Sequence, residues 1–217
     1  AGRLILDTFL SPDPAAGLAS LAAELRQRAS ARLVTDLSWT RLTRWRALLA
    51  QIFENEIYRR QIPHFSEINV CYECVAEGRV PPTALLLAGW LASTLGWRAA
   101  GEPALRFERP GGDARLLFRW QQAHWPMGRL ASFELISREE PAARIAVART
   151  GEACGEVSVE VAGLEPVMNR VSLARSNDVL LLGEELSIYR PDPVFEQSLG
   201  RALEIAQRLG SLQGEQR

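Results

Sequence analysis

The stretch from Asp36 to Glu54 reads DLSWTRLTRWRALLAQIFE, and it decides how the first half of the chain is organised. Its second part repeats apolar residues three or four positions apart, which is the spacing of one helical face. The residues of that face are Trp45, Leu48, Leu49, Ile52 and Phe53. The pattern predicts an amphipathic helix, with Thr43 as its candidate N-cap.

The same stretch carries two tryptophans and three arginines at the entry to this helix, here called the Trp/Arg cluster: Trp39, Arg41, Arg44, Trp45 and Arg46. Trp and Arg are enriched among binding hot spots, so the five residues are candidates for contacting a partner protein. They also fit a structural role, in which the tryptophans lie in the core and the arginines cap, stack or stay in solvent. We expect Arg41 to lie over Trp45.

Strand-like and helical segments alternate around this stretch. We expect strands at Arg3–Asp7, Ala31–Asp36 and Glu67–Val75, a helix from Asp13-Pro14, a helical turn at Ile57–Ile62, and a buried helix at Leu85–Leu95 opened by Pro81-Pro82. Gly89, inside that buried helix, predicts the close approach of another element. The β-α-β-α-β order predicts an α/β layer with partly parallel strands.

The second half of the chain has a different pattern. Short segments rich in β-formers alternate with turn residues such as Gly111-Gly112 and Pro126, which predicts an antiparallel meander. Two helices follow, one capped by Asn177 or Asp178 and one beginning at Asp192-Pro193. The predicted fold class is α/β (α+β): a mixed sheet with helices, a central meander and two C-terminal helices. We expect one domain over residues 1–217, with possible sub-structure at 1–100 and 101–217.

Composition limits the classes of function. The chain has 217 residues and a net charge of −1, so no overall field attracts nucleic acid or an anionic membrane. All 25 basic residues are Arg, which excludes a Schiff-base or P-loop lysine. Three cysteines are too few for a secreted disulfide scaffold, so we expect a cytoplasmic protein. The chain begins directly in a strand-like run, and we expect that it is a fragment of a longer protein.

The sequence contains no strong catalytic motif. The two histidines, His64 and His124, have no serine in a recognisable nucleophile setting nearby, so no catalytic residue, cofactor or metal ligand is predicted. Cys71 and Cys74 have the CxxC spacing of redox and metal sites and form a possible redox pair. On the predicted strand, however, residues three apart point to opposite faces. The acidic pairs Glu139-Glu140 and Glu184-Glu185 are expected to be solvated.

Four segments together resemble the OpcA family of glucose-6-phosphate dehydrogenase assembly proteins, in its C-terminal part. They are LILDT (4–8), the stretch at 36–54, LLLAGWLASTLGW (85–97) and EELSIYRPDPVFEQSL (184–199). The D-L-x-W-x-R-x-x-x-W-R pattern that begins at Asp36 is the most specific. The match departs at Arg44, where the family is expected to have proline. The resemblance implies a non-catalytic protein that binds glucose-6-phosphate dehydrogenase and promotes its oligomerisation or activation in the oxidative pentose phosphate pathway.

Two other hypotheses stay open beside this one. The chain could be a sugar-phosphate or nucleotide-binding domain that uses the Trp/Arg cluster as an anion site near a helix N-terminus. Alternatively, Trp39, Trp45, Trp90 and Trp97 could all belong to one core, with the interface elsewhere, for example on an exposed edge of the meander. Neither nucleic acid nor membrane is an expected partner.

Overall fold

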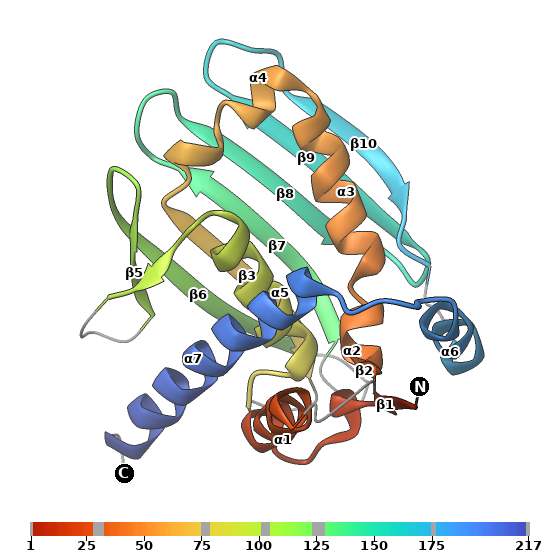
Figure 1. Ribbon diagram of the computed structural model, residues 1–217. Helices are drawn as coiled ribbons and strands as arrows, with labels where there is room; N and C mark the ends of the chain where they lie inside the picture. The colour runs from red at the N-terminus through yellow and green to blue at the C-terminus, as the bar shows by residue number, and fades with distance from the viewer. Residues whose placement is uncertain are drawn as a thin grey trace.

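In the computed structural model, the chain is described over residues 2–27, 33–74, 79–100, 105–122, 129–174 and 177–215, with backbone alone from 211 onward. The described part is a mixed α/β structure in which helices pack on an eight-stranded sheet, with a two-stranded sheet beside it (Figure 1). This confirms the predicted fold class. Ala31, Val75 and His124 lie outside the described residues.

The large sheet has the strand order β10-β9-β8-β7-β3-β6-β5-β4. Its strands are β3 (Glu67–Cys74), β4 (Arg98–Ala99), β5 (Arg106–Arg109), β6 (Gly112–Gln122), β7 (Arg129–Ser137), β8 (Ala143–Arg149), β9 (Cys154–Val161) and β10 (Val167–Ser172). Strands β7 to β10 form the predicted antiparallel meander.

The meander is not continuous, because β3 lies between β6 and β7. This strand pairs in parallel with β6 and antiparallel with β7. The prediction of an unbroken meander was wrong at this point, since a strand from the first half of the chain supplies the partner for both. Residues before and after position 100 therefore build one sheet.

The two-stranded sheet pairs β1 (Arg3–Leu6) in parallel with β2 (Leu33–Asp36). The helix α1 (Pro14–Arg26) follows β1, and the Asp13 carboxylate caps it by accepting hydrogen bonds from the Ala15 and Ala16 amides at 3.1 and 3.2 Å. The predicted parallel β-α-β unit is thus present. Its strands stand apart from β3, however, which joins the large sheet instead.

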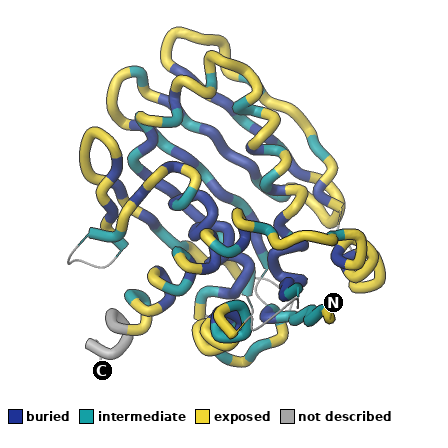
Figure 2. The backbone as a smooth tube through the Cα atoms, viewed as in Figure 1, coloured by how far each residue is buried: buried dark blue, intermediate teal, exposed yellow. Residues whose placement is uncertain are grey.

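Three long helices cover one face of the large sheet (Figure 1). The helices α3 (Thr43–Glu54) and α5 (Pro82–Thr94) contact the strands, and α7 (Pro193–Glu215) packs along α5. Gly89 allows that packing, because a Cβ there would lie 2.4 Å from the Ser198 carbonyl oxygen and 2.7 Å from the Ala202 nitrogen. The close approach predicted at Gly89 is confirmed. Buried residues follow the strands and α5 (Figure 2).

The opposite face of the sheet is polar, and ion pairs cross its strands. Arg138 and Arg115 both contact the Glu67 carboxylate, and Arg144 links Glu134 to Glu160. Opposite charges on neighbouring strands stabilise their pairing by a few tenths of a kcal/mol to about 1 kcal/mol per pair. Helices therefore bury one face of the sheet, and charged side chains on the other face pair with one another.

Short helices complete the described chain: η1 (Thr8–Leu10), α2 (Leu37–Thr40), α4 (Glu56–Arg59), η2 (Ile62–His64) and α6 (Asp178–Leu186). Thr43 is not an N-cap, contrary to the prediction. Asp36 caps the preceding α2, and the chain enters α3 through Leu42, which is already helical and makes no side-chain cap. None of the described helices is both long and apolar enough to cross a bilayer.

Candidate functional site

Trp39 and Arg46 form an internal joint between α2, α3 and the start of α7. Trp39 is 4% exposed, and its Nε1 donates a hydrogen bond to Asp192 Oδ2 at 2.9 Å. Its ring packs against Phe195 at 5.5 Å, and the Arg46 guanidinium lies 3.7 Å from the ring centroid. Burial lowers the pKa of Arg46 to about 10. This half of the motif serves the fold directly.

Trp45 is also buried, and it joins α3 to the sheet. Its ring packs against Phe133 of β7 at 6.2 Å, while Arg149 of β8 lies 5.6 Å from its ring centroid. Trp90 and Trp97 belong to the same core. All four tryptophans of the core hypothesis are thus buried in the structure.

Arg41 does not lie over Trp45, contrary to the expectation. The short helix α2 ends at Thr40, and the turn that follows directs the Arg41 side chain toward Asp7 and away from Trp45. Arg41 donates to both oxygens of Asp7 at 2.6 and 2.8 Å, and it lies 4.9 Å from the Phe9 ring centroid. Burial disfavours the charged guanidinium, but the Asp7 carboxylate outweighs this and raises the pKa of Arg41. Asp178 adds a longer contact at 3.4 Å.

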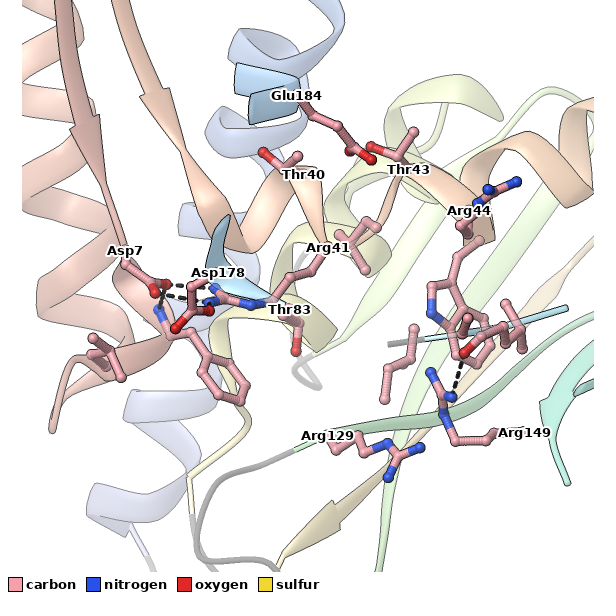
Figure 3. Close-up of a pocket in the computed structure, with 17 residues that line it drawn as sticks. Asp7, Thr40, Arg41, Thr43, Arg44, Thr83, Arg129, Arg149, Asp178 and Glu184 are labelled. Carbon is pink, nitrogen blue, oxygen red and sulfur yellow. Dashed lines mark hydrogen bonds and ion pairs between the residues drawn. The ribbon is translucent and has the colours of Figure 1, made fainter. Parts of the chain in front are cut away.

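Arg44 is the exposed member of the Trp/Arg cluster. Among the residues that the structure describes, no carboxylate lies within ion-pair distance of Arg44. Its position at the start of α3 places it at the rim of a pocket (Figure 3). Whether the five cluster residues contact a partner stays a prediction, and the burial of both tryptophans leaves Arg44 as the most accessible of them.

The pocket has a volume of about 480 Å³ and lies between α2, α3, the N-terminus of α5, α6 and the ends of β7 and β8. Its two ends differ in charge (Figure 3). At the paired end, Arg41 is neutralised by Asp7 and Asp178. At the cationic end, which consists of Arg129 and Arg149 with Arg44 at the rim, the pocket is lined by arginines and an apolar wall.

The sequence analysis did not identify Arg129, Arg149 or Thr83 as site residues. β7 begins at Arg129 and β8 ends at Arg149, so the antiparallel pairing of these strands puts both arginines at one edge of the sheet. That signal was available once the two strands were predicted as neighbours. Thr83, on the first turn of α5, gave no signal of its own.

The specific aspartate of the motif, Asp36, is structural. Its carboxylate accepts hydrogen bonds from the Thr8 amide at 3.0 Å, the Thr8 hydroxyl at 2.6 Å and the Ser38 amide at 3.3 Å. Burial raises the pKa of Asp36 to about 6, and the hydrogen bonds only partly oppose this. Asp36 thereby ties β2 and α2 to η1.

The remaining candidate groups do not gather at the pocket. Cys71 and Cys74 lie on β3, where Cys74 packs against the core and the Cys71 thiol contacts Gln121 Oε1 at 3.8 Å. Burial raises the pKa of the Cys71 thiol, which disfavours the reactive thiolate. A redox role for the pair stays a prediction. Within the described ranges, no group of three or more His, Cys, Asp or Glu side chains is placed to hold a metal ion.

The acidic pairs were expected to be solvated, and for Glu185 this was wrong. Glu185 is 1% exposed, and its carboxylate accepts a hydrogen bond from the Thr40 hydroxyl. It is buried because it closes α6 onto α2, where Arg46 lies nearby. Glu139 instead forms an ion pair with the buried Arg109.

The fold belongs to a class of mixed α/β domains that also occurs in oxidoreductases. A dehydrogenase from Chromobacterium violaceum is similar over 99% of this chain and 71% of its own, with a TM-score of 0.57 and 12% identity. KijD10, a 3-ketoreductase from Actinomadura kijaniata, is similar over 94% of this chain and 68% of its own, with a TM-score of 0.50 and 14% identity. At these identities the likeness concerns the fold alone.

The sequence identifies the family within that class. A family model described as the C-terminal domain of the glucose-6-phosphate dehydrogenase subunit matches residues 32–199, and the chain belongs to this family. The OxPP cycle protein OpcA of Nostoc punctiforme is 25% identical over 190 residues, and that of Synechocystis sp. is 31% identical over 97 residues. The resemblance to OpcA is thereby confirmed.

The matched stretches cover 77% and 45% of this chain, and 38% and 19% of the two relatives. The chain therefore spans well under half the length of the curated relatives that it matches.

Proposed function

We propose that this chain is a non-catalytic subunit that binds glucose-6-phosphate dehydrogenase and promotes its oligomerisation or activity in the oxidative pentose phosphate pathway. The family match over residues 32–199 carries this proposal, because the family is described as a subunit domain of that dehydrogenase. The OpcA relatives, named as OxPP cycle proteins, support the same pathway. A cytoplasmic location stays a prediction.

The chemistry of the pocket supports a role without catalysis. Among the residues that the structure describes, its lining contains neither His nor Cys, and two of its three carboxylates, Asp7 and Asp178, are engaged by Arg41. General acid–base or nucleophilic catalysis needs a titratable group that is matched to the reaction and positioned beside the substrate. The described residues of the pocket offer arginines and hydroxyls, which bind and orient.

We assign the contact with the dehydrogenase to the apolar surface around α6, which we call the α6 face. Among the described residues, five of the eleven exposed large hydrophobic side chains belong to α6 or to the residues just after it: Val179, Leu180, Leu182, Leu186 and Tyr189. Exposed apolar side chains that gather in one region are typical of protein interaction sites. Arg41 reaches the first residue of α6 through Asp178, so this surface adjoins the Trp/Arg cluster.

The burial within α6 explains how the surface is held in place. Leu181 and Glu185 point inward, and Arg3 donates to the carbonyl oxygens of Glu185 and Ile188. The helix is thus fixed from one side, while Val179 and Tyr189 are 76% and 87% exposed on the other. The exposed apolar side chains on the outer side of α6 are therefore accessible to a partner protein.

The proposal is tested by mixing this chain with the glucose-6-phosphate dehydrogenase of the same organism. We expect light scattering after size exclusion to detect a complex, and the dehydrogenase to change in oligomeric mass or specific activity. The double variant Leu180→Asp, Tyr189→Asp is expected to weaken binding at least about tenfold in calorimetry, since buried hot-spot contacts are lost. Met168→Asp, at an equally exposed apolar residue on β10, is the matched control.

Two results would overturn these assignments. Absence of a complex at micromolar concentrations, or turnover of a metabolite by this chain alone, contradicts the subunit role. Equal loss of binding in the Met168→Asp control contradicts the α6 face as the contact surface while leaving the subunit role standing.

A further inference from the structure

The charges of the pocket are unevenly distributed, with the paired carboxylates at one end and arginines at the other. The carboxylates Asp7 and Asp178 meet Arg41 at the paired end. At the cationic end, no described carboxylate lies within ion-pair distance of Arg129. Arg129 Nη2 makes a long hydrogen bond to the Glu152 carbonyl at 3.5 Å, which leaves its charge available to an anion.

Arg149 is held in position by backbone groups. Its Nη1 donates to the Leu173 carbonyl at 2.7 Å and to the Glu152 carbonyl at 3.0 Å. Carbonyl acceptors at fixed positions orient the guanidinium. The Arg149 guanidinium also lies 5.6 Å from the centroid of the Trp45 ring, within the range of a cation–π contact. The guanidinium is therefore pre-organised, so less side-chain freedom is lost when it binds an anion.

Thr83 lines the same pocket, nearer the paired end, and also lacks a described partner (Figure 3). Its side chain is buried, with the residue 4% exposed, and among the described residues its Oγ1 has no hydrogen-bond partner. Figure 3 shows Thr83 between the two ends of the pocket, with its hydroxyl directed into the pocket. A buried hydroxyl without a partner costs about 1–3 kcal/mol, so such groups are rare unless something else satisfies them.

The N-terminus of α5 adds to the positive field. Thr83 is the second residue of this 13-residue helix, and the N-cap Pro81 makes no side-chain cap. The positive end of the helix dipole favours an anion there, although Pro82 has no amide hydrogen and the Ala84 amide already donates to the Pro81 carbonyl at 3.0 Å. The helix end, the unsatisfied hydroxyl and the arginines thus act on the same space.

The rest of the cationic end is apolar. Trp45, Leu130 and Leu173 are all at least 96% buried and line it. A volume of about 480 Å³ is within the range of small-molecule sites and larger than a bare phosphate needs. The wall suits the carbon skeleton of a metabolite.

We propose that this pocket binds a phosphate monoester of a small metabolite, with the phosphate between Arg129 and Arg149, near Thr83, and the carbon skeleton against Trp45 and Leu173. Guanidinium groups bind phosphate oxygens in pairs, which favours phosphate over a halide. The site adds a ligand to a chain proposed above as a binding subunit, and it does not depend on that proposal, because the isolated chain is expected to bind.

Calorimetry with the isolated chain tests the site, using glucose 6-phosphate, inorganic phosphate and glucose as probes. We expect saturable binding of glucose 6-phosphate, weaker binding of inorganic phosphate and none of glucose. Equal affinities for the two phosphates would overturn the contact with the carbon skeleton. Absence of saturable binding by either would overturn the site.

Variants locate the binding. Arg129→Gln is expected to weaken glucose 6-phosphate binding about tenfold, since one charge-assisted hydrogen bond is lost. Thr83→Val is expected to weaken it about threefold, and Arg44→Gln at the rim by less. Arg59→Gln on α4 removes the same charge from an exposed residue outside the pocket and is the control. An equal loss in this control would show that only overall charge matters and would overturn the assignment.

Discussion

The internal part of the Trp/Arg cluster and the cationic end of the pocket use the same residue types for different purposes. In the internal part, Arg46 stacks on Trp39 and Arg41 is paired with Asp7, so both guanidinium groups are engaged by side chains of the chain itself. At the cationic end, Trp45 is equally buried, but Arg129 has no described acidic partner. The comparison teaches that an arginine near a tryptophan stabilises the fold when a side chain of the same chain engages its charge. Where no acidic side chain does so, the arginine is available to bind a ligand.

The largest effect is expected where the cluster is internal. Trp39→Ala removes a buried indole, its hydrogen bond to Asp192 and the surface on which Arg46 stacks. We expect a loss of about 3–5 kcal/mol in the free energy of unfolding, measured by urea denaturation. Trp120→Ala, at a residue that is 39% exposed, is the control and should lose far less. Similar losses in the two variants would mean that Trp39 is not part of the core.

Asp36 sharpens the comparison, because it is a buried carboxylate with no arginine partner in the part of the chain that the structure describes. Its folded pKa of about 6 exceeds the ordinary value of 3.8, so the folded state retains its proton at pH values where the unfolded state has lost it. Its contribution to stability is therefore present below about pH 4 and is lost as the pH rises to about 6. The loss should reach about 2–3 kcal/mol.

Asp36→Asn should flatten that part of the profile of unfolding free energy against pH, since the amide does not titrate. The measurement is chemical denaturation of both proteins between pH 4 and pH 7. A wild-type profile as flat as that of the variant would show that Asp36 ionises normally in the folded state.

Arg41→Gln tests the paired end. It leaves the half-buried Asp7 without its bidentate partner, and the neighbouring Asp178 is a second carboxylate that offers no positive charge in its place. We expect the free energy of unfolding to fall by about 1–3 kcal/mol, between the values for exposed and fully buried pairs. If high salt abolished the difference in stability between the wild type and the variant, the contact would be an ordinary surface pair, because salt screens exposed charges.

The smallest effect on stability is expected for Thr83→Val. The valine has the shape of threonine, and the hydroxyl that it removes has no described partner. The unliganded variant should be as stable as the wild type or slightly more stable in thermal unfolding. A clear loss of stability would mean that the hydroxyl is bonded within the fold and is not reserved for a ligand.

Local patterns predicted much of this structure. The apolar spacing from Trp45 to Phe53 predicted α3, and the alternating pattern after position 140 predicted β8 and β9. Gly89 predicted a close approach, which α7 makes. Each depends on residues close in sequence. The same patterns could not place β3 between β6 and β7, because strand order is set by packing between segments far apart in the chain.

The site depended even more on distant contacts. Arg41 was paired with the wrong residue in the sequence analysis, since its partner Asp7 lies between β1 and η1, 34 residues away. Arg129 and Arg149 meet only through the pairing of β7 with β8. The Thr83 hydroxyl lacks a described hydrogen-bond partner because of how the pocket is assembled, and no local sequence pattern predicts this.

The most direct test of the division compares Arg41→Gln with Arg129→Gln in one experiment: the thermal unfolding midpoint with and without glucose 6-phosphate. A ligand that binds the folded state raises that midpoint. We predict that Arg41→Gln starts from a lower midpoint and keeps the ligand-induced rise, whereas Arg129→Gln keeps the wild-type midpoint and loses the rise. Identical behaviour of the two variants would contradict the division between a fold-stabilising part and a ligand-binding end.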